Sequence, residues 1–361
     1  MTARVATFLD LPAASPGGSV ELFRDLYTGA EPLIPARAFM LDASHNGLQA
    51  VPGLDLLAVD GKCLDEPGFT QYVTALHRAL ADVLDPGEVD VVHLQHLTFG
   101  ATPALLRTLP DHPTVALVHG TDLLFAETYP DQLRVLRDTV RSADGIVVPT
   151  SAMADRLHTL APTTDRVVKI PWGIPDHLLA GPPPRRPPPD GRQRLLYAGR
   201  LTPEKGGDRL TRALGTATDY TLSIAAPPHE FYALRPALRQ AGLDVDYLGW
   251  LPRPELWKAF ADHDALLMPS TTLEAMGLVA LEAQACGLPV LYQPVPGLDE
   301  TLGESALPTD FTDPDQLAAN LRRFVVPGLA DDLRESARTN ATRFPLSATA
   351  SALTALSDSL S

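Results

Sequence analysis

Short apolar runs of strand length alternate with longer amphipathic stretches along this chain. In the first half the strand-like runs lie at residues 3–9, 89–94, 114–120, 144–150 and 167–171. The second half repeats the alternation, with strand-like runs at residues 194–199, 220–226, 243–250, 264–270 and 288–293. Strands separated by helix-length segments predict parallel βαβ units in each half. We therefore expect an α/β protein with two doubly wound domains facing each other across a cleft, where ligands bind beyond the carboxyl ends of the strands.

A proline-rich segment, Gly181 to Arg192, separates these halves. Such a composition is typical of a stiff, extended connector, so residues 181–192 are predicted to be a linker between a first domain at 1–180 and a second at 193–340. The final residues show three successive helical patterns, at 315–325, 329–344 and 347–360. The last part, 341–361, is expected to be a helix that packs across the domain junction.

Composition narrows the class of protein. Of the 361 residues 45% are hydrophobic, which is ample for two cores. Neither a spanning run of about 18 apolar residues nor a signal peptide is recognisable, so we expect a cytoplasmic protein. The net charge of −15 argues against nucleic-acid binding and against a basic membrane-binding face. Only four of the 29 basic residues are lysines, which is typical of a GC-rich bacterial genome, and Cys63 and Cys286 are expected to be reduced thiols.

The stretch TLEAMGLVALEAQACGLPV, residues 272–290, carries the most specific pattern. Gly277 would cost roughly 1 kcal/mol inside a helix, so the helix is predicted to begin after it, at residues 278–286. The preceding strand is then 264–270, and residues 271–277 form the loop beyond its carboxyl end. The N–H groups of Gly277, Leu278 and Val279 would form an anion site at the helix N-terminus.

Two carboxylates, Glu274 and Glu282, flank that anion site. Carboxylates bind phosphate poorly but accept hydrogen bonds from sugar and ribose hydroxyls. The combination indicates a sugar nucleotide as ligand.

A second motif, YAGRLTPEKG, presents Arg200 and Lys205 on a loop after the strand at 194–199. Two cations at the carboxyl end of a strand suit a diphosphate, whose charge grows as it leaves. The alternative is structural: Arg200 pairs with Glu204 and Lys205 is solvated.

The first half carries weaker signals. Gly17 and Gly18 follow the first strand, where they either let a ligand approach the backbone or form an ordinary turn. His119 ends the strand of 114–120 and is either functional or structural. His93 and His96, from HLQH, are predicted to line the acceptor side rather than to bind metal, because a third ligand is missing.

Together, GRLTPEKG, the paired glutamates of 272–290, the early GG and VHGTD resemble the retaining glycosyltransferases of family 4, which have two Rossmann-like domains in the GT-B fold. The resemblance implies that Glu282 accepts ribose hydroxyls and Glu274 faces the transferred sugar. It assigns the diphosphate to Arg200 and Lys205, and a contact with the donor sugar to His119. The remaining implied contacts are Gly18 near the phosphates, the backbone of Met276, Gly277, Leu278 and Val279, and a base pocket at 247–252 that includes Leu248, Gly249, Trp250 and Leu251. One departure is Trp172-Gly173, where the family often has Asn-Gly.

The implied reaction transfers a hexose from a nucleotide sugar, with a UDP-sugar as the default donor, and needs neither a cofactor nor a metal. Three D-x-D matches, at 244–246, 262–264 and 313–315, are not predicted to bind metal, because the first two run into strands and the third looks like a helix cap. Two alternatives stay open: a nucleotide-sugar 2-epimerase of the same architecture, and a non-catalytic nucleotide-sugar-binding protein.

Charge also bears on the acceptor. Acidic residues outnumber basic ones in residues 1–110, a field that repels anionic lipid and attracts cations. We expect a soluble small-molecule acceptor, such as an aminosugar or aminocyclitol of secondary metabolism, and no membrane insertion. An equally weighted interpretation is that the acidity only keeps the protein soluble.

Overall fold

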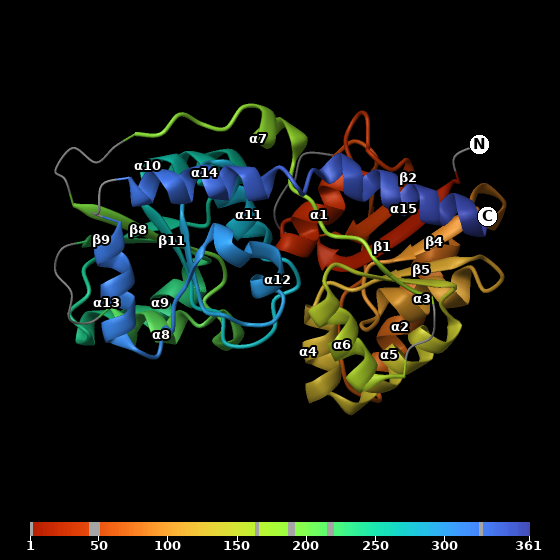
Figure 1. The fold of residues 1–361 in the computed structure, drawn as a ribbon. Helices are drawn as coiled ribbons and strands as arrows, with labels where there is room; N and C mark the ends of the chain where they lie inside the picture. The colour runs from red at the N-terminus through yellow and green to blue at the C-terminus, as the bar shows by residue number, and fades with distance from the viewer. Residues whose placement is uncertain (1–2, 43–50, 163–165, 187–191, 215–219, 325–327) are drawn as a thin grey trace. The chain divides into compact units, whose positions relative to one another are not determined.

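The computed structural model describes residues 3–42, 51–162, 166–186, 192–214, 220–324 and 328–361. The chain forms two compact units (Figure 1): Met1–Trp172 together with Leu346–Ser361, and Gly173–Pro345. Each unit contains a parallel sheet with helices, so the predicted α/β class with two doubly wound, Rossmann-like units is confirmed. In the part of the chain that the structure describes, no helix is both long enough and apolar enough to cross a membrane.

The first unit is built on a seven-stranded sheet with the order β3-β2-β1-β4-β5-β6-β7. Every neighbouring pair is parallel. The strands are β1 (Val5–Pro12), β2 (Ala36–Leu41), β3 (Leu54–Leu57), β4 (Val91–Leu94), β5 (Thr114–Leu117), β6 (Gly145–Val148) and β7 (Val167–Lys169). Every position of β4, β5 and β6 is buried, as in parallel sheets that helices cover on both faces.

The helices of the first unit come from both ends of the chain. They are α1 (Gly18–Tyr27), α2 (Gly68–Ala81), η1 (Pro86–Glu88), α3 (Ala101–Thr108), α4 (Thr121–Thr128), α5 (Pro130–Ser142), α6 (Ser151–Leu160) and α15 (Leu346–Leu360). The last of these, dark blue in Figure 1, is fixed to the sheet by hydrogen bonds: Ser357 Oγ lies 2.7 Å from His93 Nε2, and the amide of Ala3 donates to Asp358 Oδ1 at 2.8 Å.

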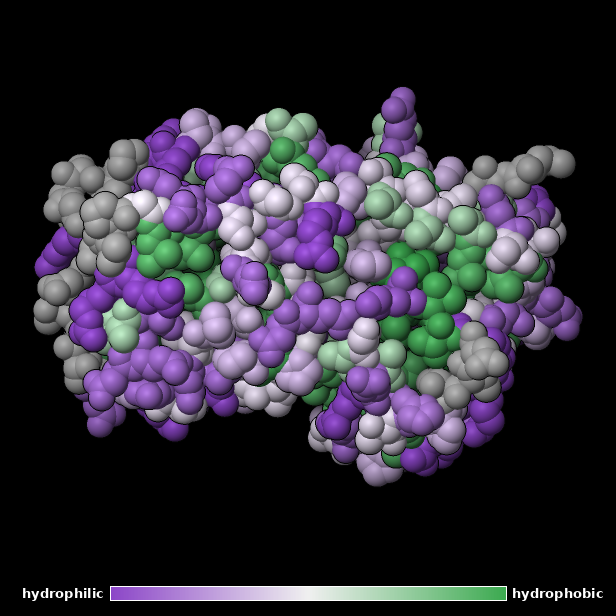
Figure 2. All heavy atoms as spheres, in the orientation of Figure 1, coloured by the Kyte–Doolittle hydropathy of each residue, from purple (hydrophilic) through white to green (hydrophobic). Residues whose placement is uncertain are grey.

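The second unit is built on a six-stranded parallel sheet with the order β10-β9-β8-β11-β12-β13. Its strands are β8 (Gln193–Ala198), β9 (Tyr220–Ala225), β10 (Val245–Gly249), β11 (Ala265–Met268), β12 (Val290–Tyr292) and β13 (Leu307–Pro308). Its helices are α7 (Asp176–Ala180), η2 (Pro203–Lys205), α8 (Gly207–Ala213), α9 (Pro228–Gln240), α10 (Arg253–Asp262), α11 (Leu278–Ala285), α12 (Leu298–Leu302), η3 (Gly303–Ser305), α13 (Pro314–Arg323) and α14 (Leu329–Ala341). On the face shown in Figure 2, α13 and α14 expose mostly hydrophilic side chains, while Leu317, Leu321 and Leu333 are buried.

The boundaries of the units differ from those expected for 1–180, 181–192, 193–340 and 341–361. The chain passes from the first unit to the second at Trp172–Gly173, and the described part of the proline-rich segment belongs to the second unit. There the amide of Arg186 donates to Ala261 O at 3.1 Å, and Arg185 pairs with Asp264. Residues 187–191 lie outside the described part. These contacts hold the segment along α10, so its proline content does not mark the point where the chain changes units.

Candidate functional site

Three loops at the carboxyl ends of β8, β11 and β12 are packed together through glycines. Gly206 has φ 70°, and a Cβ added there would lie 2.0 Å from the carbonyl oxygen of Pro269. Gly297 has φ 91°, and its added Cβ would lie 1.7 Å from the carbonyl oxygen of Glu274. Only glycine fits such left-handed, crowded positions without displacing backbone. The loop that carries Glu274 is therefore held from both sides.

Lys205 and Glu274 form an ion pair on these loops. Lys205 Nζ lies 2.6 Å from Glu274 Oε1, and Ser270 Oγ donates to the same oxygen at 2.7 Å. The side chain of Glu274 is 8% exposed. Its second oxygen, Oε2, accepts no hydrogen bond from any described residue. A carboxylate held in this way keeps one oxygen for a ligand hydroxyl, while the ammonium group retains two N–H donors.

Arg200 lies on the same loop as Lys205. Its guanidinium is 3.6 Å from Glu204 Oε1, and its carbonyl accepts a hydrogen bond from the hydroxyl of Tyr197. The expected alternative, in which Arg200 pairs with Glu204 and Lys205 is solvated, is thus correct for Arg200. It is wrong for Lys205, which is bound to Glu274. The diphosphate role of the two cations stays a prediction.

The helix after Gly277 begins as the sequence predicts. Helix α11 starts at Leu278, and Gly277 caps it with φ 66°. The carbonyl of Gly277 accepts the amides of Ala280 at 2.8 Å and Leu281 at 3.2 Å. Among described residues, the N–H groups of Gly277, Leu278 and Val279 have no hydrogen-bond acceptor. This is the arrangement that binds anions at helix N-termini.

Glu282 lies one turn inside α11 and is 4% exposed. Its Oε1 accepts Nε and Nη2 of Arg253, at 3.0 and 2.5 Å, and its Oε2 accepts the indole N–H of Trp257 at 2.8 Å. Neither partner is predicted by the sequence motif. A signal for them was present, because Arg253 and Trp257 are four residues apart and so share one face of α10.

The segment predicted to line the base pocket ends β10. Gly249 has φ 79° with open space around an added Cβ, and its carbonyl accepts the amide of Ala226 at 2.9 Å. Leu248 and Leu251 are partly buried, and Trp250 is 40% exposed. The segment lies at a strand's carboxyl end as expected, and its contact with a base stays a prediction.

In the first unit, His119 follows β5 and lies among other rings. Its ring centroid is 4.9 Å from that of His96 and 5.6 Å from that of Trp172, on which it stacks. The ring nitrogens His119 Nε2 and Trp172 Nε1 are buried without a hydrogen-bond partner in the described structure. Burial lowers the pKa of His119 to about 4 and lowers the pKa of His96 well below its usual value, with His119 and Lys62 adding to the effect on His96. Both imidazoles are therefore neutral at physiological pH.

A buried carboxylate in the same unit, Asp10, was not predicted from the sequence. Asp10, at 1% side-chain exposure, ends 3.4 Å from Lys62 Nζ, and its Oδ2 accepts the amide of Gly100 at 3.0 Å. Lys62 also donates to the carbonyl of Asp10 at 2.8 Å and lies 5.0 Å from the ring centroid of Phe99. The positive charge of Lys62 is thus matched locally by Asp10.

The prediction that His93 lines the acceptor side is wrong. The residue is 0% exposed, and its ring bridges Tyr27 Oη at 2.8 Å and Ser357 Oγ at 2.7 Å. It is a hydrogen-bonded core histidine, because β4 is covered on both faces. Gly17, with φ 149°, immediately precedes α1, which begins at Gly18. No atom lies within 4 Å of a Cβ added to Gly17, so the backbone there is open to a ligand.

One D-x-D segment behaves as the sequence predicts. The carboxylate of Asp313 accepts the amides of Asp315 at 3.0 Å and Gln316 at 3.2 Å, and so caps α13. The predicted absence of a metal stays a prediction.

Comparison with known proteins gives matches over most of the chain. Residues 50–178 match the family model described as Glycosyltransferase Family 4, and residues 183–344 match the model described as Glycosyl transferases group 1. The D-inositol 3-phosphate glycosyltransferase of Thermobispora bispora is 31% identical over 324 residues, which cover 80% of this chain and 75% of that protein. The protein of the same description from Acidothermus cellulolyticus is 29% identical, over 76% of this chain and 67% of its own length.

Solved structures agree on the fold. A sucrose-phosphate synthase from Thermosynechococcus elongatus superimposes with a TM-score of 0.85 at 18% identity, covering 99% of both chains. The Anabaena protein HepE, solved in complex with UDP-glucose, superimposes with a TM-score of 0.76, also at 18% identity and 99% coverage of both chains. Both the family models and these neighbours agree with the two Rossmann-like units described above, and the chain belongs to family 4 of the glycosyltransferases, with the GT-B fold.

Proposed function

We propose that this glycosyltransferase transfers a hexose from a UDP-sugar, with retention of the anomeric configuration and without a metal ion. The observation that carries the donor proposal is the N-terminus of α11, where three amides without a hydrogen-bond acceptor among the described residues follow Glu274, the partner of Lys205, by three to five positions. An anion bound there would meet backbone donors and an ammonium group together. The UDP-glucose complex of HepE supports uridine as the first base to test.

The chemistry needs no nucleophile from the protein. The acceptor hydroxyl attacks the anomeric carbon on the face that the diphosphate is leaving, and the bond from that carbon to the phosphate oxygen breaks. The proton of the hydroxyl passes to the departing phosphate oxygen, through an oxocarbenium-like state. Lys205 and Arg200 stabilise the charge that grows on the diphosphate. The Oε2 atom of Glu274 holds a hydroxyl of the sugar, while its Oε1 is fixed by Lys205 and Ser270.

For the acceptor we favour a soluble polyol or cyclitol, such as an aminosugar or aminocyclitol. Around His119 the first unit offers neutral imidazoles, and Asp10 balances the charge of Lys62. Such a lining suits hydroxyl or amine groups better than a phosphate. The names of the relatives make D-inositol 3-phosphate the second acceptor to test.

The test has two stages. A thermal-shift panel of UDP-, GDP-, ADP- and dTDP-sugars identifies the donor, because a ligand at 100 times its Kd stabilises the folded state by about 2.7 kcal/mol. The selected donor is then incubated, with and without EDTA, with aminocyclitols and with D-inositol 3-phosphate, and the anomeric proton of the product is followed by NMR. We expect retention and full activity in EDTA. An inverted product, or loss of turnover in EDTA, would overturn the corresponding part of the proposal.

The same assay separates the other functions. A 2-epimerase would change the donor without an acceptor, and a nucleotide-sugar-binding protein would show a thermal shift without turnover. A transferase releases UDP in step with added acceptor.

A further inference from the structure

The carboxylate of Glu282 is held by two residues of α10. Neither residue belongs to the motif at 272–290. Arg253 donates two N–H groups to Oε1, at 3.0 and 2.5 Å, and Trp257 donates its indole N–H to Oε2 at 2.8 Å. All three residues are largely buried: the side chains of Arg253 and Glu282 are 14% and 6% exposed, and Trp257 as a whole residue is 9% exposed. A charge-assisted pair with two N–H groups fixes geometry as well as charge.

These contacts determine how much acceptor capacity Glu282 keeps. A carboxylate has about four lone-pair positions, two on each oxygen. Arg253 fills both positions on Oε1, and Trp257 fills one of the two on Oε2. Among the described residues there is no further donor to this carboxylate, so one position on Oε2 is left. A carboxylate held only by solvent could accept both ribose hydroxyls, one through each oxygen.

We propose that Arg253 and Trp257 are positioning residues that leave Glu282 with a single acceptor position, so that it reads one ribose hydroxyl of the donor and ignores the other. The inference rests on the proposed nucleotide-sugar donor and adds a specificity to it. As a consequence, a donor that lacks the ribose hydroxyl that Glu282 does not contact binds nearly as well as the donor with both hydroxyls.

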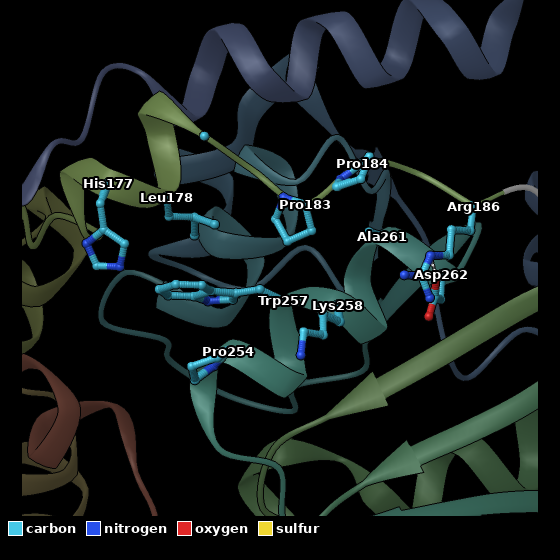
Figure 3. Close-up of a pocket in the computed structure, with 11 residues that line it drawn as sticks. His177, Leu178, Pro183, Pro184, Arg186, Pro254, Trp257, Lys258, Ala261 and Asp262 are labelled. Carbon is cyan, nitrogen blue, oxygen red and sulfur yellow. Dashed lines mark ion pairs between the residues drawn. The ribbon is translucent and has the colours of Figure 1, made fainter.

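The surroundings of Trp257 make its N–H group a separable test. The ring lines a cavity of about 310 Å³ together with His177, Leu178, Pro183 and Pro254 (Figure 3). The centroid of His177 lies 5.3 Å from that of Trp257, and Figure 3 shows the two rings beside each other at one end of the cavity. His177 contacts the indole, and the described structure shows no hydrogen bond or ion pair between His177 and Glu282. It therefore provides a control for changes to the cavity wall alone.

The first experiment compares UDP-glucose with its 2′-deoxyribose and 3′-deoxyribose analogues in the wild-type protein, by calorimetric Kd and by KM. One analogue should bind within about threefold of UDP-glucose, and the other should bind at least tenfold more weakly, because it leaves the last position of Glu282 unfilled. A tenfold loss with both analogues would overturn the single-position count. Undiminished binding of both would show that Glu282 reads no ribose hydroxyl.

The second experiment substitutes the two residues that hold Glu282, Arg253 and Trp257. Trp257→Phe returns one position to Oε2, so the analogue that the wild type tolerates should now bind at least fivefold more weakly than UDP-glucose. Arg253→Met should raise the donor KM about tenfold with kcat unchanged, and Arg253→Lys should recover part of that loss. The matched control, His177→Ala, should keep the wild-type pattern with all three donors.

The two hypotheses fail in different ways. If UDP-glucose is turned over by the wild type and Trp257→Phe gains no discrimination, the inference about Glu282 is wrong and the proposed function stands. If UDP-glucose neither binds nor turns over, the proposed donor is wrong. A fall in kcat with unchanged KM in Arg253→Met would show that Arg253 does not act through donor binding.

Discussion

At the scale of single residues, Lys205 and Arg200 differ although both are cations on one loop. Lys205 is bound to a carboxylate that is 8% exposed, whereas Arg200 makes a looser contact of 3.6 Å with the partly exposed Glu204. Lys205→Met should therefore lower the free energy of unfolding by about 1 to 3 kcal/mol, because it leaves Glu274 without its charged partner. Arg200→Ala should change it by less than about 0.5 kcal/mol.

Both substitutions should lower kcat, because each removes a charge that stabilises the leaving diphosphate. We expect the activation free energy to rise by roughly 2 to 4 kcal/mol in each variant. Urea unfolding measures the first effect and initial rates measure the second. A useful control is the double variant Lys205→Met with Glu274→Gln, which should recover most of the lost stability and none of the activity. Equal losses of stability in Arg200→Ala and Lys205→Met would contradict the assignment.

The sequence could predict those residues that act through backbone position. Gly277 and the start of α11 follow from the cost of glycine inside a helix, and Lys205 follows from its place after a strand. The partners of Glu282 could not be predicted, because they depend on which neighbouring helix lies against α11. His93 was misassigned for a related reason. The local sequence around a histidine near a strand end does not show whether a helix covers its side chain.

At the scale of elements, Gly297 couples the loop before α12 to the loop that carries Glu274. A Cβ at Gly297 would lie 1.7 Å from the carbonyl oxygen of Glu274, so that carbonyl has to move. We expect Gly297→Ala to lower kcat/KM at least tenfold, because a displacement of about 1 Å near reacting groups can cost a factor of about 100. Gly242→Ala is the matched control: φ is 74°, and no atom lies within 4 Å of the added Cβ. The Gly242→Ala variant should have only the backbone strain of alanine at positive φ, without a steric clash, and should keep its activity.

Central strands that are buried at every position agree with the predicted elements, although β2 (Ala36–Leu41), with four of its six residues buried, was not predicted. The runs at 89–94 and 114–120 correspond to β4 and β5, whose positions are all buried. The strand β3 (Leu54–Leu57), which lies at an edge of the sheet, was not foreseen. Two of its four residues are exposed, so no continuous apolar run marks it.

At the scale of the whole molecule, acid should destabilise the first unit more than the second, where burial lowers the pKa of one described histidine, His263. Burial lowers the pKa of His93 and of His119 from 6.5 to about 4, and it lowers the pKa of His96 well below its usual value. The unfolded chain takes up these protons below pH 6.5 and the folded unit does not, so stability is complete above pH 6.5 and falls toward pH 4. Asp122 acts in the opposite direction, because burial raises its pKa to about 6.

Each group contributes about 1.4 kcal/mol per pH unit, so a net two groups give a slope of about 2.7 kcal/mol per pH unit near pH 5. Hydrogen exchange in β4, β5 and β6 between pH 4.5 and 6.5 measures this slope. His93→Gln should reduce it by about half. His229→Gln, at an exposed position of the second unit, should leave it unchanged. A slope near zero in the wild type would contradict the buried neutral state.

The overall charge of −15 leads to a prediction about the acceptor. If the acceptor is a cationic amine, its KM should rise with ionic strength while the KM of the donor changes less, because salt screens long-range attraction. N-acetylation of the acceptor should abolish this salt effect. Full activity on a neutral lipid acceptor, or pelleting with anionic vesicles, would contradict it.

The composition of the first unit from two separate stretches has a consequence for biosynthesis. Its sheet is complete by residue 169, yet α15, which holds Asp358 against Ala3 and Ser357 against His93, is translated after the entire second unit. On the ribosome, 173 further residues, Gly173 to Pro345, are synthesised between the strands of the first unit and that helix. During this interval the second unit can fold as one uninterrupted stretch, while the older half of the polypeptide still exposes the apolar surface that α15 will cover. A nascent chain stalled between these points would thus engage chaperones through its first-made part.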